Sequence, residues 1–221
     1  MCGVKKVGLI INPIAGVGGK AGLKGSDGEA TQKEALAKGI KPESPDKAMI
    51  ALETMQELKG KIEIYTYEGK MGQEEAEKAG FPVHVTGKPE TSGHTTSTDT
   101  EKLARALVNE NMDLILFAGG DGTARNVYRA VGDKIPVIGI PAGVKIHSGV
   151  YAINPKGAGR AANQFLEGKM TKTKEAEVMD LDEELYRKGV ICPKLYGYMA
   201  VPDNKKTMQN VNCLLYTSRC V

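Results

Sequence analysis

Over about the first 170 residues, short runs of apolar residues alternate with stretches in which apolar residues recur at helical spacing. Two runs, residues 4–11 and 113–118, are almost continuously apolar, and the second reads DLILFA. Runs of this length are typical of central parallel strands that are covered on both faces. Shorter strands are predicted at residues 61–67, 82–86 and 136–140.

Helical spacing fills the intervals between these runs. Ser44 is predicted to cap a helix whose first position is Pro45, and Thr98 opens a capping box with Glu101. Further helices are predicted at residues 71–79, 123–131 and 157–166. Because strands alternate with helices, we expect an α/β fold with a doubly wound, mostly parallel sheet.

The pattern changes after about residue 175. Residues 178–181 and 196–201 are strand-like, with no long helical stretch between them. We therefore predict one α/β domain over residues 1–170 and, over residues 171–210, the beginning of a β-rich second domain that remains incomplete.

The last nine residues, CLLYTSRCV, do not continue either pattern. They can be encoded by TGTCTCTTATACACATCTAGATGTGTA, which contains a transposase-type sequencing adapter joined to its own reverse complement. We expect residues 213–221 to be a non-native tail and the natural chain to continue beyond about residue 210. The encoding DNA tests this expectation, because a different codon string would contradict it.

Composition narrows the class of protein. The net charge is only +3, Trp is absent and aromatic residues make up 5%, so neither a basic stripe nor a base-stacking surface for nucleic acid is expected. The four cysteines form no C-x-x-C pair, which favours a reduced intracellular setting. Apolar runs are too short for a signal peptide or a membrane span, so we expect a cytoplasmic protein that binds no membrane.

The sharpest motif is GGDGT, which follows the apolar run at residues 113–118. Gly119, Gly120 and Gly122 leave room for backbone N–H groups to reach a phosphate, and the helix predicted from Thr123 adds its positive end. Asp121 can accept a hydroxyl proton or help to hold a magnesium ion on phosphates. The alternative is a tight turn in which Asp121 only caps the helix.

A second glycine-rich loop follows the first predicted strand. It contains Asn12, Pro13, Gly16, Gly18 and Gly19, but it matches neither the Walker A spacing nor the dinucleotide G-x-G-x-x-G spacing. Two readings stay open, a phosphate-facing loop and a flexible connection.

A third loop, GIPAGVKIHSG at residues 139–149, also follows a predicted strand. Lys145 is a candidate phosphate contact, with a surface lysine as the alternative. His147 and Ser148 have no acidic partner nearby in the sequence, so no hydrolase triad is predicted. Because all three loops follow strands, we expect them to meet at one edge of the sheet.

At these residues the chain resembles the ATP-NAD kinase family. The GGDGT loop is that family's signature, and three longer segments look like a prokaryotic branch described as predicted ATP- or polyphosphate-dependent NAD kinases. These segments are NPIAGVGGKAGLKGSDG (12–28), IPAGVKIHSGVYAINP (140–155) and LDEELYRKGVICPKLYGYMAVP (181–202), so the resemblance covers most of residues 4–205.

The resemblance implies a nucleotide-binding kinase domain, a β-rich second domain and a site in the cleft between them. It also implies magnesium-dependent transfer of a phosphoryl group from ATP or polyphosphate to the 2′-hydroxyl of the adenosine ribose of NAD. Asp121 corresponds to the family's essential aspartate, and Gly119, Gly120, Gly122 and Thr123 would surround the phosphates. Family members are usually homo-oligomers.

Two departures leave other functions open. The segment GIPAGVKIHSG replaces the Asn-rich G-I-N-x-G-x-x-G-F of well-studied NAD kinases, and the family's later Asn-Glu pair has no counterpart in this sequence. The alternatives are a lipid or sugar-phosphate kinase on the same fold and a non-catalytic nucleotide-binding protein that resembles an accessory protein of acetoin catabolism.

Overall fold

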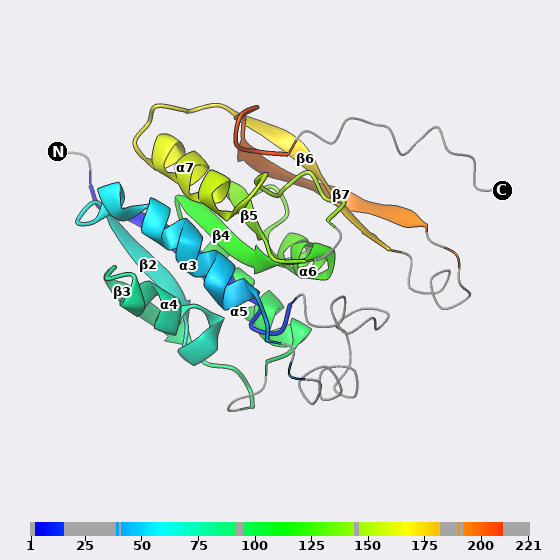
Figure 1. Cartoon of the computed structure of the whole chain (residues 1–221), viewed down its shortest axis with the longest axis horizontal. Helices are drawn as coiled ribbons and strands as arrows, with labels where there is room; N and C mark the ends of the chain where they lie inside the picture. Colours follow the sequence, from blue (N-terminus) through cyan, green and yellow to red (C-terminus); the bar gives the residue numbers. More distant parts are fainter. Residues whose placement is uncertain are drawn as a thin grey trace.

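The computed structural model describes residues 3–15, 39, 41–91, 95–143, 146–181, 190 and 192–209. Its centre is a five-stranded sheet in the order β3-β2-β1-β4-β5, in which every neighbouring pair is parallel (Figure 1). The strands are β1 (Lys5–Ile11), β2 (Ile62–Tyr67), β3 (Val83–Gly87), β4 (Leu114–Gly119) and β5 (Val137–Pro141). The prediction of an α/β fold with a parallel sheet is therefore confirmed.

Helices cover both faces of this sheet. α3 (Ser44–Thr54) packs beside α7 (Pro155–Leu166) on one face, and α5 (Ser97–Asn109) packs beside α6 (Asp121–Val131) on the other (Figure 1). α4 (Gln73–Lys78) lies against α3 and β3, and short 3-10 turns occupy Gln56–Leu58 and Gly69–Met71. β4 is buried along its whole length because both faces of the sheet are covered, as the DLILFA run predicted.

Two predicted helix starts were wrong by one or two residues. Ser44 is the first residue of α3 rather than its cap, and its hydroxyl lies 3.5 Å from the Ala15 carbonyl oxygen. The capping box of α5 is formed by Thr96 and Asp99 instead of Thr98 and Glu101. Asp99 is 1% exposed and its carboxylate accepts hydrogen bonds from the backbone N–H groups of Thr96 and Glu90, so it caps the helix.

An antiparallel ribbon follows the five-stranded sheet. β6 (Thr173–Leu181) pairs with β7 (Pro193–Pro202), and the register shifts at a bulge between Val178 and Met179. The ribbon packs against α6 and β5, and it extends away from the sheet in Figure 1. The boundary at residue 170 stays a prediction, and the predicted tail at 213–221 lies outside the described residues.

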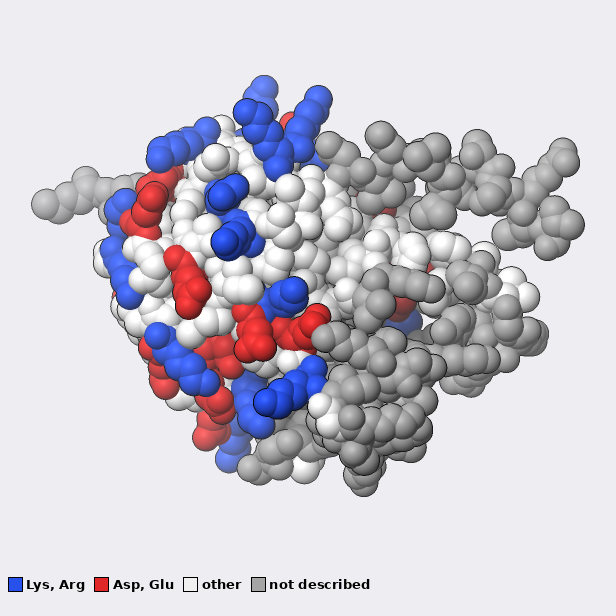
Figure 2. All heavy atoms as spheres, in the orientation of Figure 1, with Lys and Arg blue, Asp and Glu red and all other residues white. Residues whose placement is uncertain are grey.

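Charged side chains of both signs are interspersed on the face shown in Figure 2, which agrees with the small net charge. Of the helices in the described ranges, none combines the length and apolar character needed to cross a membrane.

Candidate active site at the carboxyl edge of the sheet

The ends of β1, β4 and β5 meet at one edge of the sheet. The Asn12 N–H donates to the Ala118 carbonyl oxygen at 3.0 Å, and the Ala142 N–H donates to the Gly119 carbonyl oxygen at 3.0 Å. Gly143 lies against Gly120 so closely that a β-carbon on Gly143 would be 3.1 Å from the Gly120 Cα. The segments after all three strands are therefore neighbours, as the sequence predicted.

The turn from β4 into α6 depends on glycine. A β-carbon on Gly119 would collide with the side chain of Thr123 one turn further on, so only glycine fits here without a shift. The turn is shorter than the four residues expected, because α6 begins at Asp121 and includes Gly122. Asp121 is thus the first helical residue, where its charge interacts favourably with the helix dipole.

Asn12 joins the first loop to this turn. Its Nδ2 donates to Thr123 Oγ1 at 3.0 Å, and its Oδ1 accepts from the Ile14 N–H at 3.2 Å. Pro13 lies in the same turn. The predicted contacts at Gly16, Gly18, Gly19 and Lys145 lie outside the described residues.

The Asp121 carboxylate holds the segment after β5 in place. Oδ2 accepts from the His147 N–H at 2.8 Å and lies 3.1 Å from His147 Nδ1. Oδ1 accepts from the Ser148 hydroxyl at 2.6 Å and from the Ser148 N–H at 3.1 Å. Three donors and the His147 ring nitrogen therefore surround the two oxygens of Asp121, which is only 7% exposed.

Ser148 extends this network to the ribbon. Its side chain is fully buried, its oxygen accepts from the Met179 N–H at 2.9 Å, and it lies 2.8 Å from the Met179 carbonyl oxygen. The single hydroxyl proton favours Asp121, because a hydrogen bond to a charged acceptor is the stronger one. Met179 lies at the bulge of β6. The hydrogen bonds from Asp121 through Ser148 to Met179 therefore connect α6 to the ribbon.

His147 and Ser148 were missed as functional candidates because their acidic partner is distant in the sequence. Asp121 precedes them by 26 and 27 residues, and no local spacing marks that contact. The order of contacts differs from that of a hydrolase triad. In such a triad the imidazole lies between the carboxylate and the serine hydroxyl, whereas here the Asp121 carboxylate lies between Ser148 and His147.

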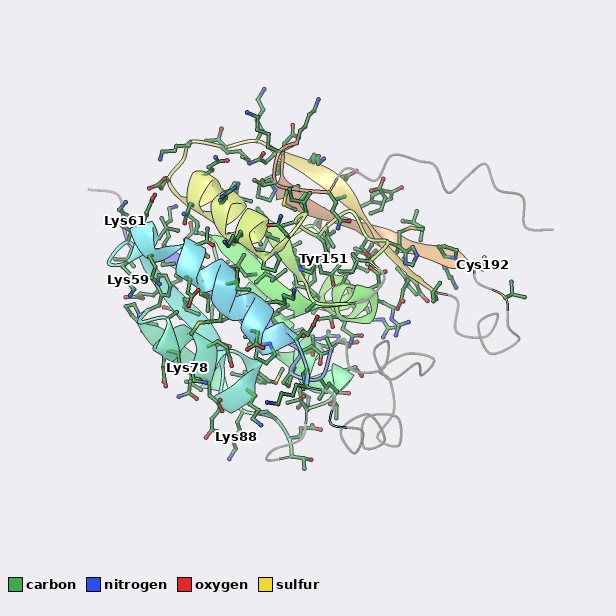
Figure 3. The ribbon with its side chains drawn as sticks, viewed as in Figure 1. Lys59, Lys61, Lys78, Lys88, Tyr151 and Cys192 are labelled. Atoms are coloured by element: carbon green, nitrogen blue, oxygen red, sulfur yellow. The ribbon has the colours of Figure 1, made fainter. Side chains whose placement is uncertain are left out.

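Tyr151 stabilises the turn between β4 and α6. Its hydroxyl donates to the Gly120 carbonyl oxygen at 2.6 Å, and its ring packs edge-on against Phe117 with the centroids 5.3 Å apart. Burial raises the pKa of Tyr151 well above its ordinary value, and the charges of Asp121 and Asp180 raise it further. The hydroxyl is therefore a permanent donor. Figure 3 shows Tyr151 far from Lys59, Lys61 and Lys78.

An ion pair joins α6 to the ribbon. Arg125 Nη1 lies 3.1 Å from Asp180 Oδ2, with the two side chains 12% and 18% exposed. The guanidinium also lies 5.4 Å from the centroid of the Tyr196 ring on β7. A β-carbon on Gly122 would be 3.8 Å from Asp180 Oδ2, an ordinary contact, so Gly122 brings the first turn of α6 close to this pair.

Hydrogen bonds already occupy the Asp121 carboxylate, for which a magnesium contact was predicted. Each carboxylate oxygen offers about two acceptor sites; Oδ1 receives two donors, and Oδ2 receives one donor and lies 3.1 Å from His147 Nδ1. Direct coordination would require that one donor be displaced. Within the ranges that the structure describes, no group of three or more His, Cys, Asp or Glu side chains is placed to hold a metal ion.

Comparison with known families agrees with the fold. The model of the ATP-NAD kinase N-terminal domain matches residues 7–170, a range that holds most of β1, the other four parallel strands and the GGDGT turn. The chain therefore belongs to the ATP-NAD kinase family. A search of the curated proteins finds no match.

Proposed function

We propose that this protein phosphorylates NAD, transferring a phosphoryl group from ATP or polyphosphate to the 2′-hydroxyl of the adenosine ribose. The observation that carries the proposal is the family match over residues 7–170, with the GGDGT turn of that match at the sheet edge. A kinase-type phosphotransferase follows from the family. The acceptor, the donor and a cytoplasmic location belong to the proposal.

The backbone groups and the helix end at this edge of the sheet are suited to phosphoryl transfer. Such reactions need mainly positioning and neutralisation of charge, because little covalent chemistry falls to the protein. Gly119, Gly120 and the first turn of α6 bring backbone N–H groups and the positive end of a helix dipole to one place. We assign phosphate contacts to this turn and to Thr123.

The first loop extends the proposed nucleotide site. Asn12 is fixed against Thr123, so the loop that follows β1 leaves the sheet beside the turn. We expect the residues predicted from sequence, Gly16, Gly18, Gly19 and Lys145, to complete the phosphate contacts. Magnesium is expected as a partner of the donor phosphates. Because hydrogen bonds from His147 and Ser148 occupy the Asp121 carboxylate, no step is assigned to a metal on this residue.

An acceptor panel tests the proposal against its alternatives. The full-length product of the gene is incubated with magnesium, with ATP or polyphosphate as donor, and with NAD, NADH, a sphingoid base or a sugar phosphate. We expect donor consumption only with a pyridine dinucleotide. Consumption with the lipid or the sugar phosphate alone would identify a different kinase, and tight nucleotide binding without any consumption would identify a binding protein.

A further inference from the structure

The guanidinium of Arg125 lies beside the first turn of α6, to which phosphate contacts are assigned. Its Nη1 is 3.1 Å from Asp180 Oδ2, and a β-carbon on Gly122 would be 3.8 Å from that same oxygen. Arg125 itself belongs to the second turn of the helix. Long side chains in helices lean toward the helix N-terminus, which explains why its charged end reaches back to the first turn.

Two residues of the ribbon fix the guanidinium in this position. Asp180 on β6 pairs with Nη1, and the centroid of the Tyr196 ring on β7 is 5.4 Å from the guanidinium carbon. Packing restricts the side chain further, because only 12% of it is exposed. An arginine that is already ordered by the fold loses little conformational entropy when it binds a ligand.

The charges around this turn give Arg125 a use. Asp121 at the start of α6 and Asp180 beside Gly122 both place negative charge near the turn, which disfavours an incoming phosphate. Arg125 supplies a full positive charge at the same place. Its planar fork carries five N–H donors, more than the two of a bidentate carboxylate pair, so an arginine can contact a carboxylate and a phosphate together.

We propose that Arg125 binds a phosphate group of a substrate at the first turn of α6, from the position that Asp180 and Tyr196 give it. This inference rests on the proposed function, which assigns phosphate contacts to that turn. Both substrates of the proposed reaction carry such groups, in the phosphate chain of the donor and in the diphosphate of NAD. Because Asp180 and Tyr196 lie on the ribbon, the ribbon takes part in forming the phosphate site.

The test measures binding, so it needs no turnover. Isothermal titration calorimetry of the full-length protein gives the Kd of three probes, which are ATP with magnesium, inorganic tripolyphosphate and NAD. Arg125→Ala should raise the Kd of at least one probe by about tenfold or more, because a hydrogen bond to a charged group is lost. Arg125→Gln keeps a donor for Asp180 but has no charge, and it should show a similar loss.

A second readout separates a phosphate contact from a purely structural ion pair. Salt screens the attraction between a guanidinium and a phosphate, so the wild-type Kd of the affected probe should rise with salt concentration. This dependence should become shallower in Arg125→Ala and Arg125→Gln, since the contacting charge has been removed. An arginine that only stabilises the fold would leave the salt dependence of binding unchanged.

The matched control is Arg129→Ala, which removes the arginine one turn further along the same helix. Arg129 pairs with Glu101 of α5 and its side chain is 52% exposed, so it faces α5 and not the ribbon. This variant should keep the wild-type Kd for all three probes. Circular dichroism shows which variants fold, and Arg125→Gln carries the test if Arg125→Ala does not.

The outcomes identify the bound phosphate and separate the two proposals. A loss confined to ATP and tripolyphosphate assigns Arg125 to the donor, and a loss confined to NAD assigns it to the acceptor. A folded Arg125 variant with the wild-type Kd for every probe would overturn the inference, as would a wild type that binds none of them. A wild type that binds its probe through Arg125 but forms no NADP would overturn the proposed function and not the phosphate contact.

Discussion

The Asn12 amide nitrogen lies 3.0 Å from the Thr123 hydroxyl oxygen, and this bond joins the loop after β1 to the first turn of α6. The two residues are 111 positions apart in the chain. The bond fixes the relative position of two glycine-rich segments that both belong to the proposed nucleotide site.

Asn12→Ala and Thr123→Val should each destabilise the protein. Either change removes the bond between the two segments, and a typical intramolecular hydrogen bond contributes about 1 kcal/mol. In a double-mutant cycle measured by urea unfolding, the two effects should fall short of additivity by about 0.5 kcal/mol or more. Fully additive effects would mean that the bond does not couple the two loops.

Asp121→Asn should lower kcat by about two orders of magnitude or more. An amide at this position must present its NH₂ group to donors from His147 or Ser148, so the imidazole loses its orientation. Steady-state NADP formation by the full-length variant measures the effect. Unchanged turnover would remove Asp121 from the mechanism.

Tyr151→Phe should change how stability depends on alkaline pH. Because burial raises the pKa of Tyr151 in the folded state, the folded protein keeps this proton to higher pH than the unfolded chain does. The contribution is fully present below the ordinary pKa of 10.0 and is lost as the pH rises through the folded value. Wild type should therefore lose stability above pH 10 more steeply than Tyr151→Phe, as measured by urea unfolding from pH 8 to 11. Parallel curves would contradict this account.

Glu75→Gln should stabilise the protein at neutral pH. Glu75 lies in α4 with 5% exposure, and its Oε2 is buried without a hydrogen-bond partner among the residues that the structure describes. Burial raises its pKa above the ordinary value of 4.5, so ionisation costs stability as the pH rises through the folded value. The advantage of glutamine should shrink below pH 4.5.

The control for Glu75 is its neighbour Glu74, whose side chain is 43% exposed and lies 3.7 Å from Lys78. Glu74→Gln should change the melting temperature little at either pH, because exposed ion pairs contribute little. If Glu75→Gln melts at or below the wild-type temperature at pH 7, the prediction is contradicted. Other groups would then stabilise the buried Glu75 carboxylate of the wild type.

Much of the fold could be predicted because its pattern is local. The run DLILFA is typical of a strand covered on both faces, and the GGDGT turn after it predicted a site at the carboxyl edge of the sheet. Helix starts were less accurate, since Thr96 and Thr98 both precede an acidic residue by three positions, Asp99 and Glu101. Only tertiary packing decides which pair forms the capping box.

The contacts of the site could be predicted only in part. Asp121 was predicted from its motif, but its partners His147 and Ser148 reach it because β4 and β5 are neighbours in the sheet, a strand order that the sequence does not specify. The buried link from Ser148 to Met179 depends in turn on a bulge in β6 that no residue pattern marks.

The most direct test of the central claim is NADP formation by the wild-type, full-length protein supplied with NAD, magnesium and either ATP or polyphosphate. The product is read with an NADP-specific dehydrogenase, which responds only to the 2′-phosphorylated dinucleotide. The account predicts NADP with at least one donor, and the donor that supports it is identified in the same experiment. No NADP with either donor would contradict the assignment of NAD as the acceptor.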